Sequence, residues 1–448
     1  MKKLYRIAAL AGLVLALGAC ETFDSVFSNE KDKKGIGSTP GKREAVMAIS
    51  HQLKTDAGTS GDWIKLPEVV SNRDWLQPGG ASGNMPGHPA LGAKIEKAWR
   101  SDIGKGSGGA LRIVARPIVA GDHVYAMDAR GRVSAFDTRE GERIWRSDTA
   151  PEDSDADAVG GGIAYADDTI FAATGHGEVV ALSAKDGQVA WRRSLNHPLR
   201  AAPTVSDGRV FVVTIANEAV ALDAHNGTVL WRHNGINEPA TLMGSPSPAV
   251  LGDSVIVAYG SGEIFALRVQ NGRMAWSDLL TAPAAAGSLP AMSAIHGFPV
   301  AERGGVFVSG QNGETVALVL RTGERAWDVD VGGINTPAVA GNAVFLIGGN
   351  HKLLAMRRDN GKVIWTRDLP DLTDPEDHNS SPIIWTGPVL AGGRLFAVSS
   401  HGKLDEFSPV DGKDLAEHDL PDPSMIPPVV AGGTLYVVTD GGDLVAFR

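Results

Sequence analysis

The sequence predicts an all-β protein, an eight-bladed β-propeller of four-stranded antiparallel blades. Three observations support this prediction. A turn that closes on glycine is followed four residues later by tryptophan, as in DTREGERIWRS at 137–147, and this step recurs along the chain. The repeats are 38 to 51 residues apart, close to the roughly 40–45 residues that one blade needs. Outside the N-terminal leader and residues 42–54, no stretch has the periodicity of an amphipathic helix.

The repeat unit is clearest in PIVAGDHVYAMDARGRVSAFDTREGERIW, residues 117–145. Turns at Gly121, Gly131 and Gly141 separate four short apolar stretches, which predicts an antiparallel meander. Glycine supplies the positive φ that such tight turns require. The tryptophan at the end of the unit is expected to pack against a neighbouring blade, because burial of an indole contributes several kcal/mol, about 3–5. The repeated tryptophans are Trp99, Trp145, Trp191, Trp231, Trp276, Trp327 and Trp365.

The two ends of the repeat region predict how the ring closes. The last unit stops at Arg448 after three strands, whereas Trp99 lies in a strand at 94–102 with no meander before it. Pairing this N-terminal strand with the C-terminal unit completes the eighth blade and removes two free sheet edges. A further copy of the turn, at Gly412, has Ala416 in place of tryptophan.

The N-terminus has the pattern of a lipoprotein leader. Residues 1–19 combine a basic start with an apolar run too short for a stable membrane span, and they end at Cys20, the single cysteine of the chain. This predicts cleavage before Cys20 and lipidation of its side chain; the alternative is an ordinary signal peptide. Because Glu21 rather than aspartate follows the cysteine, we expect the periplasmic face of the outer membrane.

Three further parts follow the leader. Residues 20–60 are polar and rich in glycine, which predicts a flexible tether. Residues 61–92 contain Trp63 and Trp75, so we expect this extended segment to pack on the folded body, with a partner contact as the alternative. Residues 93–448 form the propeller, which we expect to be monomeric.

Composition and motifs argue against nucleic-acid binding and against common enzyme classes. The formal net charge is −10, and loss of the leader removes Lys2, Lys3 and Arg6. GKGSGG at 104–109 precedes a predicted strand rather than a helix, so it is not a dinucleotide site. The 12 histidines are scattered, and we predict no metal, no cofactor and no catalytic residue. A hydrolase assembled from residues distant in sequence remains open.

Two connections between blades stand out because they lack charge. Residues 279–301 contain no charged side chain, and residues 235–252 contain Glu238 alone. Neighbouring apolar loops on one rim predict a protein-docking patch. The alternative is that they fold back onto their own blades. The connection 369–382 is strongly acidic, which predicts a solvated surface, with binding of a cation or a basic partner as the alternative.

The repeats AFDTREGERIW and ALDAHNGTVLW resemble those of pyrroloquinoline-quinone (PQQ) enzymes. This resemblance implies the propeller fold over residues 93–448. Quinoprotein alcohol dehydrogenases also use an adjacent cysteine pair and a calcium site near a catalytic aspartate. Cys20 is the only cysteine here, and no CxxCH sequence is present for a covalent haem. A periplasmic PQQ-dependent oxidoreductase is therefore the alternative function.

Leader, tether and blades together resemble the BamB family of outer-membrane assembly lipoproteins. This resemblance implies a non-enzymatic scaffold of the β-barrel assembly machinery. Its partners would be the periplasmic domains of a BamA-like insertion protein and other assembly lipoproteins.

The resemblance also implies two contact loops. A leucine–x–leucine–arginine–glycine loop of the family aligns with ATLMG, where Leu242 and Gly244 match while Ala240 and Met243 depart. A loop with two aspartates aligns with AIH. The implied partner-binding residues are Leu242, Met243, Gly244, Ala294, Ile295 and His296.

Overall fold

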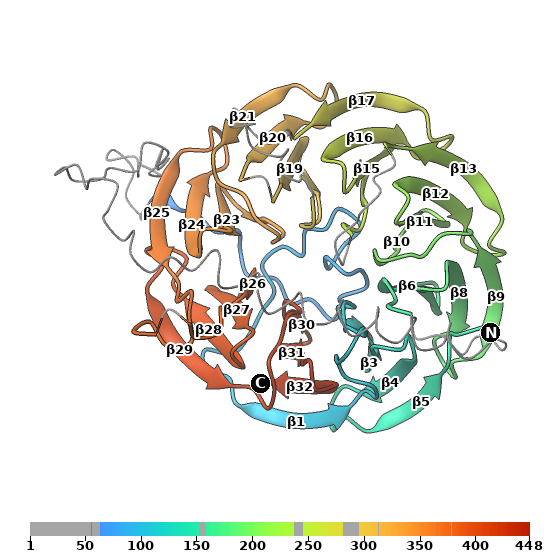
Figure 1. The fold of residues 1–448 in the computed structure, drawn as a ribbon, viewed down its shortest axis with the longest axis horizontal. Helices are drawn as coiled ribbons and strands as arrows, with labels where there is room; N and C mark the ends of the chain where they lie inside the picture. The colour runs from blue at the N-terminus through green and yellow to red at the C-terminus, as the bar shows by residue number, and fades with distance from the viewer. Residues whose placement is uncertain are drawn as a thin grey trace, which may run out of the picture. The chain divides into compact units, whose positions relative to one another are not determined.

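The chain forms a ring of eight β-sheets in a computed structural model that describes residues 55, 63–151, 158–236, 245–280, 295–311, 313–377 and 379–448. These residues lie in the unit Leu53–Arg448, the second of two into which the chain divides. They contain 32 strands and no α-helix, hence none of a length and hydropathy to span a bilayer. Each sheet has four antiparallel strands and forms one blade around a central axis (Figure 1). The predicted eight-bladed propeller is confirmed.

Each blade runs from a three- to seven-residue strand near the axis to an outermost strand on the rim. Blade 1 comprises β2 (Ile118–Ala120), β3 (His123–Met127), β4 (Val133–Asp137) and β5 (Arg143–Ser147), and blade 2 comprises β6 (Gly162–Ala166), β7 (Thr169–Ala173), β8 (Glu178–Ser183) and β9 (Val189–Ser194). Blade 3 comprises β10 (Thr204–Ser206), β11 (Arg209–Val213), β12 (Glu218–Asp223) and β13 (Val229–Asn234). Blade 4 comprises β14 (Ala249–Leu251), β15 (Ser254–Ala258), β16 (Glu263–Arg268) and β17 (Met274–Leu279).

Blades 5 to 8 follow the same order. Blade 5 comprises β18 (Val300–Glu302), β19 (Gly305–Ser309), β20 (Thr315–Val319) and β21 (Arg325–Val329), and blade 6 comprises β22 (Ala338–Ala340), β23 (Ala343–Ile347), β24 (Lys352–Arg357) and β25 (Val363–Asp368). Blade 7 comprises β26 (Trp385–Ala391), β27 (Arg394–Ser399), β28 (Lys403–Phe407) and β29 (Asp414–Asp419). Blade 8 comprises β30 (Val429–Ala431), β31 (Thr434–Val438), β32 (Asp443–Phe447) and β1 (Lys97–Asp102).

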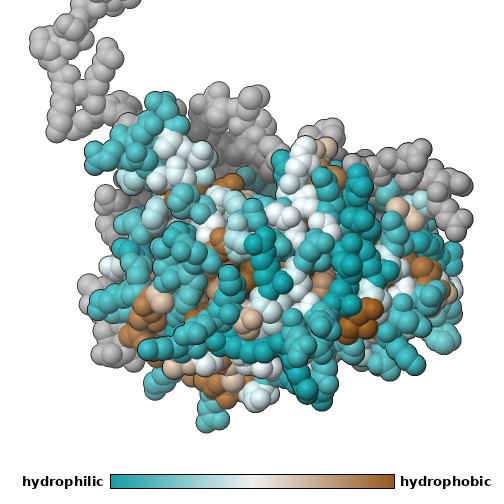
Figure 2. All heavy atoms as spheres, turned by 90° about the horizontal axis from the view of Figure 1, so that it is seen from below, coloured by the Kyte–Doolittle hydropathy of each residue, from teal (hydrophilic) through white to brown (hydrophobic). Residues whose placement is uncertain are grey.

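The position of a strand within its blade determines its residue pattern. The second strand is almost wholly apolar, as in RVFVV of β11, because neighbouring blades cover both of its faces. The outermost strand alternates, as in VLWRHN of β13, because one face meets solvent. The side of the ring that carries β1 is accordingly hydrophilic, with small separate hydrophobic patches (Figure 2).

The repeated tryptophans join consecutive blades, as predicted. Each indole Nε1 donates a hydrogen bond of 2.7–3.1 Å to a backbone carbonyl of the next blade. The turn glycines all have φ between +68° and +74°. A Cβ atom added to any of them would lie 2.5–2.7 Å from a carbon of the preceding blade's indole. The glycine therefore provides both the turn and the space for the indole, at Gly141, Gly187, Gly227, Gly272, Gly323, Gly361 and Gly412.

Blade 8 closes the ring with strands from both ends of the chain. β1 pairs antiparallel with β32, and Trp99 stands opposite Ala446. Glu96 and Arg448 exchange two backbone hydrogen bonds of 2.7 and 2.9 Å. The predicted pairing of the N-terminal strand with the C-terminal unit is confirmed.

The interface between blades 7 and 8 lacks the tryptophan. In the other blades an alanine of the third strand stands opposite the tryptophan of the fourth, whereas here Glu406 stands opposite Ala416. The buried Glu406 carboxylate accepts hydrogen bonds from Arg394 at 2.6 Å and pairs with His418 at 2.8 Å. Arg394 also donates to the backbone carbonyls of Gly92 and Ala93, just before β1. A buried polar cluster thus takes the place of the indole.

Residues 63–92, which we call the strap, touch every blade. Trp75 is buried against blade 1, and the Nδ2 atom of Asn84 donates to carbonyls of blades 4 and 5. Hydrogen bonds of 2.6–3.0 Å link the strap to blades 1 to 8 through Val119, Tyr165, Val205, Val250, Ala301, Asn342, Gly392 and Gly432. The strap therefore binds all blades to one another, since each contact involves a different sheet.

Candidate functional site

The two faces of the ring differ in what covers them. An even number of antiparallel strands returns each blade to the face on which it began, so all connections between blades lie on one face, which we call the connection face. The strap bonds to the turns between the first and second strands, at Asn342, Gly392 and Gly432, on the opposite face. The connection face therefore lies away from these strap contacts.

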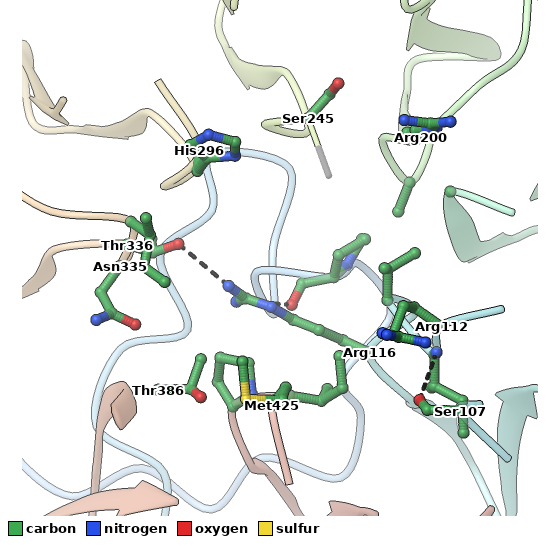
Figure 3. A pocket seen from close by; sticks show the side chains of 18 of the residues that line it. Ser107, Arg112, Arg116, Arg200, Ser245, His296, Asn335, Thr336, Thr386 and Met425 are labelled. Atoms are coloured by element: carbon green, nitrogen blue, oxygen red, sulfur yellow. Dashed lines mark hydrogen bonds between the residues drawn. The ribbon is translucent and has the colours of Figure 1, made fainter. Parts of the chain in front are cut away.

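A cavity of about 820 Å³ lies at the centre of the ring. Every blade contributes to it through the connection that precedes or begins its innermost strand, and Pro78 of the strap also lines it. Representative lining residues from the eight blades in order are Arg116, Gly161, Arg200, Ser245, His296, Asn335, Thr386 and Met425 (Figure 3).

Arg116 is the most constrained charged side chain of this cavity. Its guanidinium donates to Thr336 Oγ1 at 3.1 Å and, over a longer distance of 3.4 Å, to the carbonyl of Pro78 (Figure 3). It also lies 4.1 Å from the centre of the Phe298 ring, a cation–π geometry. Burial lowers the pKa of Arg116 to about 10, because a low-dielectric environment disfavours the charged form.

The remaining charges of the cavity are unevenly distributed. Arg112 and Arg200 also line it, whereas Asp440 is the single acidic residue among its described lining. Asp440 accepts a hydrogen bond of 2.9 Å from Ser107, and burial raises the pKa of its carboxyl group. The described wall is therefore positive in a chain whose formal net charge is −10.

Two polar side chains of the wall differ in their hydrogen bonding. Asn335 donates to the carbonyls of Ile347 and Trp385 and accepts from the Gly387 amide, so it joins blades 6 and 7. The Oγ1 atom of Thr386 is buried, and no described group bonds to it. Asn335 therefore supports the wall, whereas Thr386 keeps a hydroxyl available to a ligand.

The implied partner-binding residues lie partly outside the described part of the chain. Leu242, Met243, Gly244 and Ala294 are not among the described residues, and neither is Cys20. Ile295 is 1% exposed and packs in the core between blades 4 and 5. A direct contact between its side chain and a partner therefore does not fit the structure. His296 lines the central cavity, close to the flank of the other loop at Ser245.

Sequence reasoning missed Arg116, although a signal was present. A proline immediately precedes the innermost strand of blades 1, 3, 4, 5, 6 and 8, and Pro388 lies within that of blade 7. The residue before this proline lines the cavity as Arg116, Ala202, Phe298, Thr336 and Pro427. Comparing this one position across the repeats singles out an arginine and an aromatic residue, although it does not reveal their contact across the ring.

The described residues contain no assembled metal site. No group of three His, Cys, Asp or Glu side chains among them could hold a metal ion. The cavity wall therefore does not fit a calcium-bound quinone, which needs carboxylates at the metal. What the wall offers chemically is guanidinium groups and hydroxyls on an apolar frame.

Comparison with known proteins supports one family. The profile described as "Outer membrane protein assembly factor BamB" matches residues 93–153, 129–367 and 373–448. The assembly factor BamB of Alkalilimnicola ehrlichii is 30% identical over 172 residues, which are 38% of this chain and 42% of that relative. The match thus spans less than half of the curated relative.

Solved structures share the fold. BamB from Moraxella catarrhalis matches with a TM-score of 0.67 at 17% identity, over 79% of this chain and 100% of that one. Quinohemoprotein alcohol dehydrogenase from Comamonas testosteroni matches with a TM-score of 0.67 at 15% identity, over 84% of this chain and 81% of that one. At these identities both likenesses concern the propeller alone.

Proposed function

The chain belongs to the family of the outer membrane protein assembly factor BamB, and from this premise we propose that it is a non-enzymatic scaffold of the outer-membrane β-barrel assembly machinery. It docks the periplasmic domains of a BamA-like insertion protein and acts beside other assembly lipoproteins. Cys20 carries the lipid that holds it at the periplasmic face of the outer membrane. The propeller itself acts as a monomer.

Family membership is the observation that carries this proposal. The architecture supports it, because a closed ring with a strap across it is a rigid platform whose variable parts are its connections.

The connection face is the docking face in this proposal. The two loops implied by the resemblance end at Ser245 and His296, which line the same cavity, so their described ends lie close together. Ile236, at the start of the first loop, is 59% exposed although its backbone is anchored by Glu263 and Asn217. An exposed apolar side chain on a fixed backbone suits a protein interface.

Paired substitutions on the two faces test the docking face. Leu242→Asp with Ile236→Asp should lower capture of the insertion protein's periplasmic domains at least about 10-fold, because charge in an apolar contact is costly. Met274→Asp is the matched control, since Met274 is 56% exposed on blade 4, at the end of β17 away from the connection face. Capture that is undiminished in the double variant, with all proteins folded, would reject this docking face.

The alternative function is a PQQ-dependent oxidoreductase. The resemblance of the repeats to those of PQQ enzymes and the positive cavity are the observations behind it. Titration of the purified protein with PQQ and calcium, followed by dye-linked alcohol oxidation, distinguishes the two. Tight PQQ binding with turnover would replace the scaffold proposal.

A further inference from the structure

Arg116 has unused hydrogen-bonding capacity inside the central cavity. A guanidinium group has five N–H donors, and the described residues accept hydrogen bonds from it at two points, Thr336 Oγ1 and the Pro78 carbonyl. No described carboxylate forms an ion pair with it. Arg116 is half-buried and lies on the wall of the cavity. Its remaining donors are therefore available to an anion that enters the cavity.

The surrounding charges favour the same conclusion. Arg200 and Arg112 also line the cavity, and Arg112 interacts electrostatically with Asp440. Asp440 is the one acidic side chain of the described wall and is engaged by Ser107. An anion that enters the cavity thus meets an excess of positive charge, although the protein as a whole is acidic.

Apolar side chains form part of the wall between the polar groups. Ile113, Ala202, Phe298, Ile334 and Met425 line the space around Arg116. A volume of about 820 Å³ lies within the range of roughly 300–1,000 Å³ that is typical of small-ligand sites. The anion that suits this wall therefore carries an apolar body.

The geometry of Arg116 favours a carboxylate. One face of its guanidinium is covered by Phe298, so the group binds through its edge, where a planar carboxylate accepts two parallel N–H bonds. The buried hydroxyl of Thr386 offers a further donor on the same wall. The described wall has no carboxylate cluster for a metal, so a ligand would bind without one.

We propose that the central cavity binds an organic acid, whose carboxylate pairs with Arg116 and whose apolar body lies against Phe298, Ile334 and Met425. This inference goes beyond the docking function and does not depend on it. Two sources of such a carboxylate share the chemistry: a small organic acid, and the free C-terminus of an apolar peptide.

Calorimetric titration of the full mature protein tests the proposal with three probes. They are 4-phenylbutyrate, an N-acetylated alanine–leucine tetrapeptide with a free C-terminus, and the same peptide as its C-terminal amide. Saturable 1:1 binding of either acid supports the proposal, and the acid that binds more tightly identifies the source. The amide should bind at least about 10-fold more weakly than the free peptide, because it cannot form the charged pair. Absence of saturable binding of both acids would overturn the proposal.

Three variants locate the site. Arg116→Met should weaken binding about 10- to 100-fold, and Arg116→Lys should restore part of the loss, because lysine keeps the charge without the fork. Arg273→Met is the control, since Arg273 is an exposed arginine in the turn before β17, outside the cavity. Binding that is equal in Arg116→Met and the unmodified protein would reject the site.

A second variant, which leaves the charge of the protein unchanged, keeps the binding test valid if Arg116→Met fails to fold. Ile334 lines the cavity and is 40% exposed, so Ile334→Trp fills space without disturbing the core. It should weaken binding at least about 10-fold while thermal unfolding stays the same. Unimpaired binding in this variant would also overturn the proposal.

Discussion

The interface between blades 3 and 4 and the interface between blades 7 and 8 occupy equivalent positions in the ring, yet different chemistry holds them. At the first, Trp231 packs on the Gly272 turn and donates to the Val269 carbonyl at 2.9 Å. At the second, Glu406 is buried beside Arg394 and His418, and Ala416 takes the tryptophan's place.

The difference follows from the strands that make up blade 8. An indole of one blade needs the turn between the third and fourth strands of the next blade, because that turn supplies the glycine surface and the acceptor carbonyl. In blade 8 these strands are β32 and β1, which no turn connects. Arg394 instead bonds to the free carbonyls of Gly92 and Ala93. At the interface between blades 7 and 8, the backbone carbonyls that accept hydrogen bonds therefore belong to the segment before β1 and not to a turn. An arginine reaches them in place of an indole.

The largest expected effect is at the closing interface. Arg394→Met should lower the free energy of unfolding by about 3–5 kcal/mol, because it leaves the Glu406 carboxylate buried with only His418 as partner. Chemical denaturation followed by tryptophan fluorescence measures this loss. Adding Glu406→Leu should recover most of it, since an apolar pair replaces the ion pair. A double variant no more stable than Arg394→Met would show that the ion pair is not what holds the interface.

A smaller effect is expected at a tryptophan interface. Gly272→Ala should cost about 2–3 kcal/mol, because φ is +68° and the new Cβ would lie 2.7 Å from the Trp231 indole. Gly252→Ala is the matched control: φ is +61°, but no atom lies within 4 Å of the added Cβ. It should cost only about 1 kcal/mol, again by denaturation. Equal costs would mean that the glycine serves the turn and not the indole.

The carboxyl group of Asp405 in β28 should make the stability of the protein depend on pH. Burial, with a smaller effect of Glu417 and Asp414, raises the pKa of Asp405 to about 7, and its Oδ2 has no described hydrogen-bond partner. The folded protein therefore binds the proton of the Asp405 carboxyl group more tightly than the unfolded chain does. The free energy of unfolding falls as pH rises from about 4 to about 7 and then levels off. Asp405→Asn should raise stability at pH 8 by on the order of 1 kcal/mol and leave it nearly unchanged at pH 4. An equal effect at both pH values would contradict this assignment.

The smallest effect is expected where a tryptophan is added to the closing interface. Ala416 is exposed, and blade 8 offers no turn glycine for an indole. Ala416→Trp should change the free energy of unfolding by less than about 0.5 kcal/mol, as surface substitutions usually do. Stabilisation above about 1 kcal/mol would show that an indole needs no turn to join two blades.

Sequence reasoning predicted the repeated parts of the fold well, because repetition exposes them. The Gly141–Trp145 step could be compared across copies, and the unpaired strand around Trp99 matched the missing strand after Arg448. The strap could not be traced this way. Trp75 indicated burial, but the contact of each strap residue depends on which blade stands opposite it, which no local pattern encodes.

The candidate site was less accessible to the sequence. Glu406 stands where other blades have alanine, and Ala416 stands where they have tryptophan, so both departures from the repeat can be seen in the sequence. The ion pair between Glu406 and Arg394 cannot be seen there. Arg116 becomes meaningful only beside Phe298 and Thr336, which are about 180 and 220 residues away along the chain. A central cavity collects single residues from every repeat, and their meeting is a property of the closed ring.

The pairing of β1 with β32 also bears on how the protein is made. A chain is synthesised from its N-terminus, so the strand that completes blade 8 emerges long before its partner, Asp443–Phe447. Until then β1 has no neighbouring strand, and every intermediate length presents two unpaired edges. A chain that ends before Asp443 therefore lacks the strand that β1 needs, and its ring cannot close.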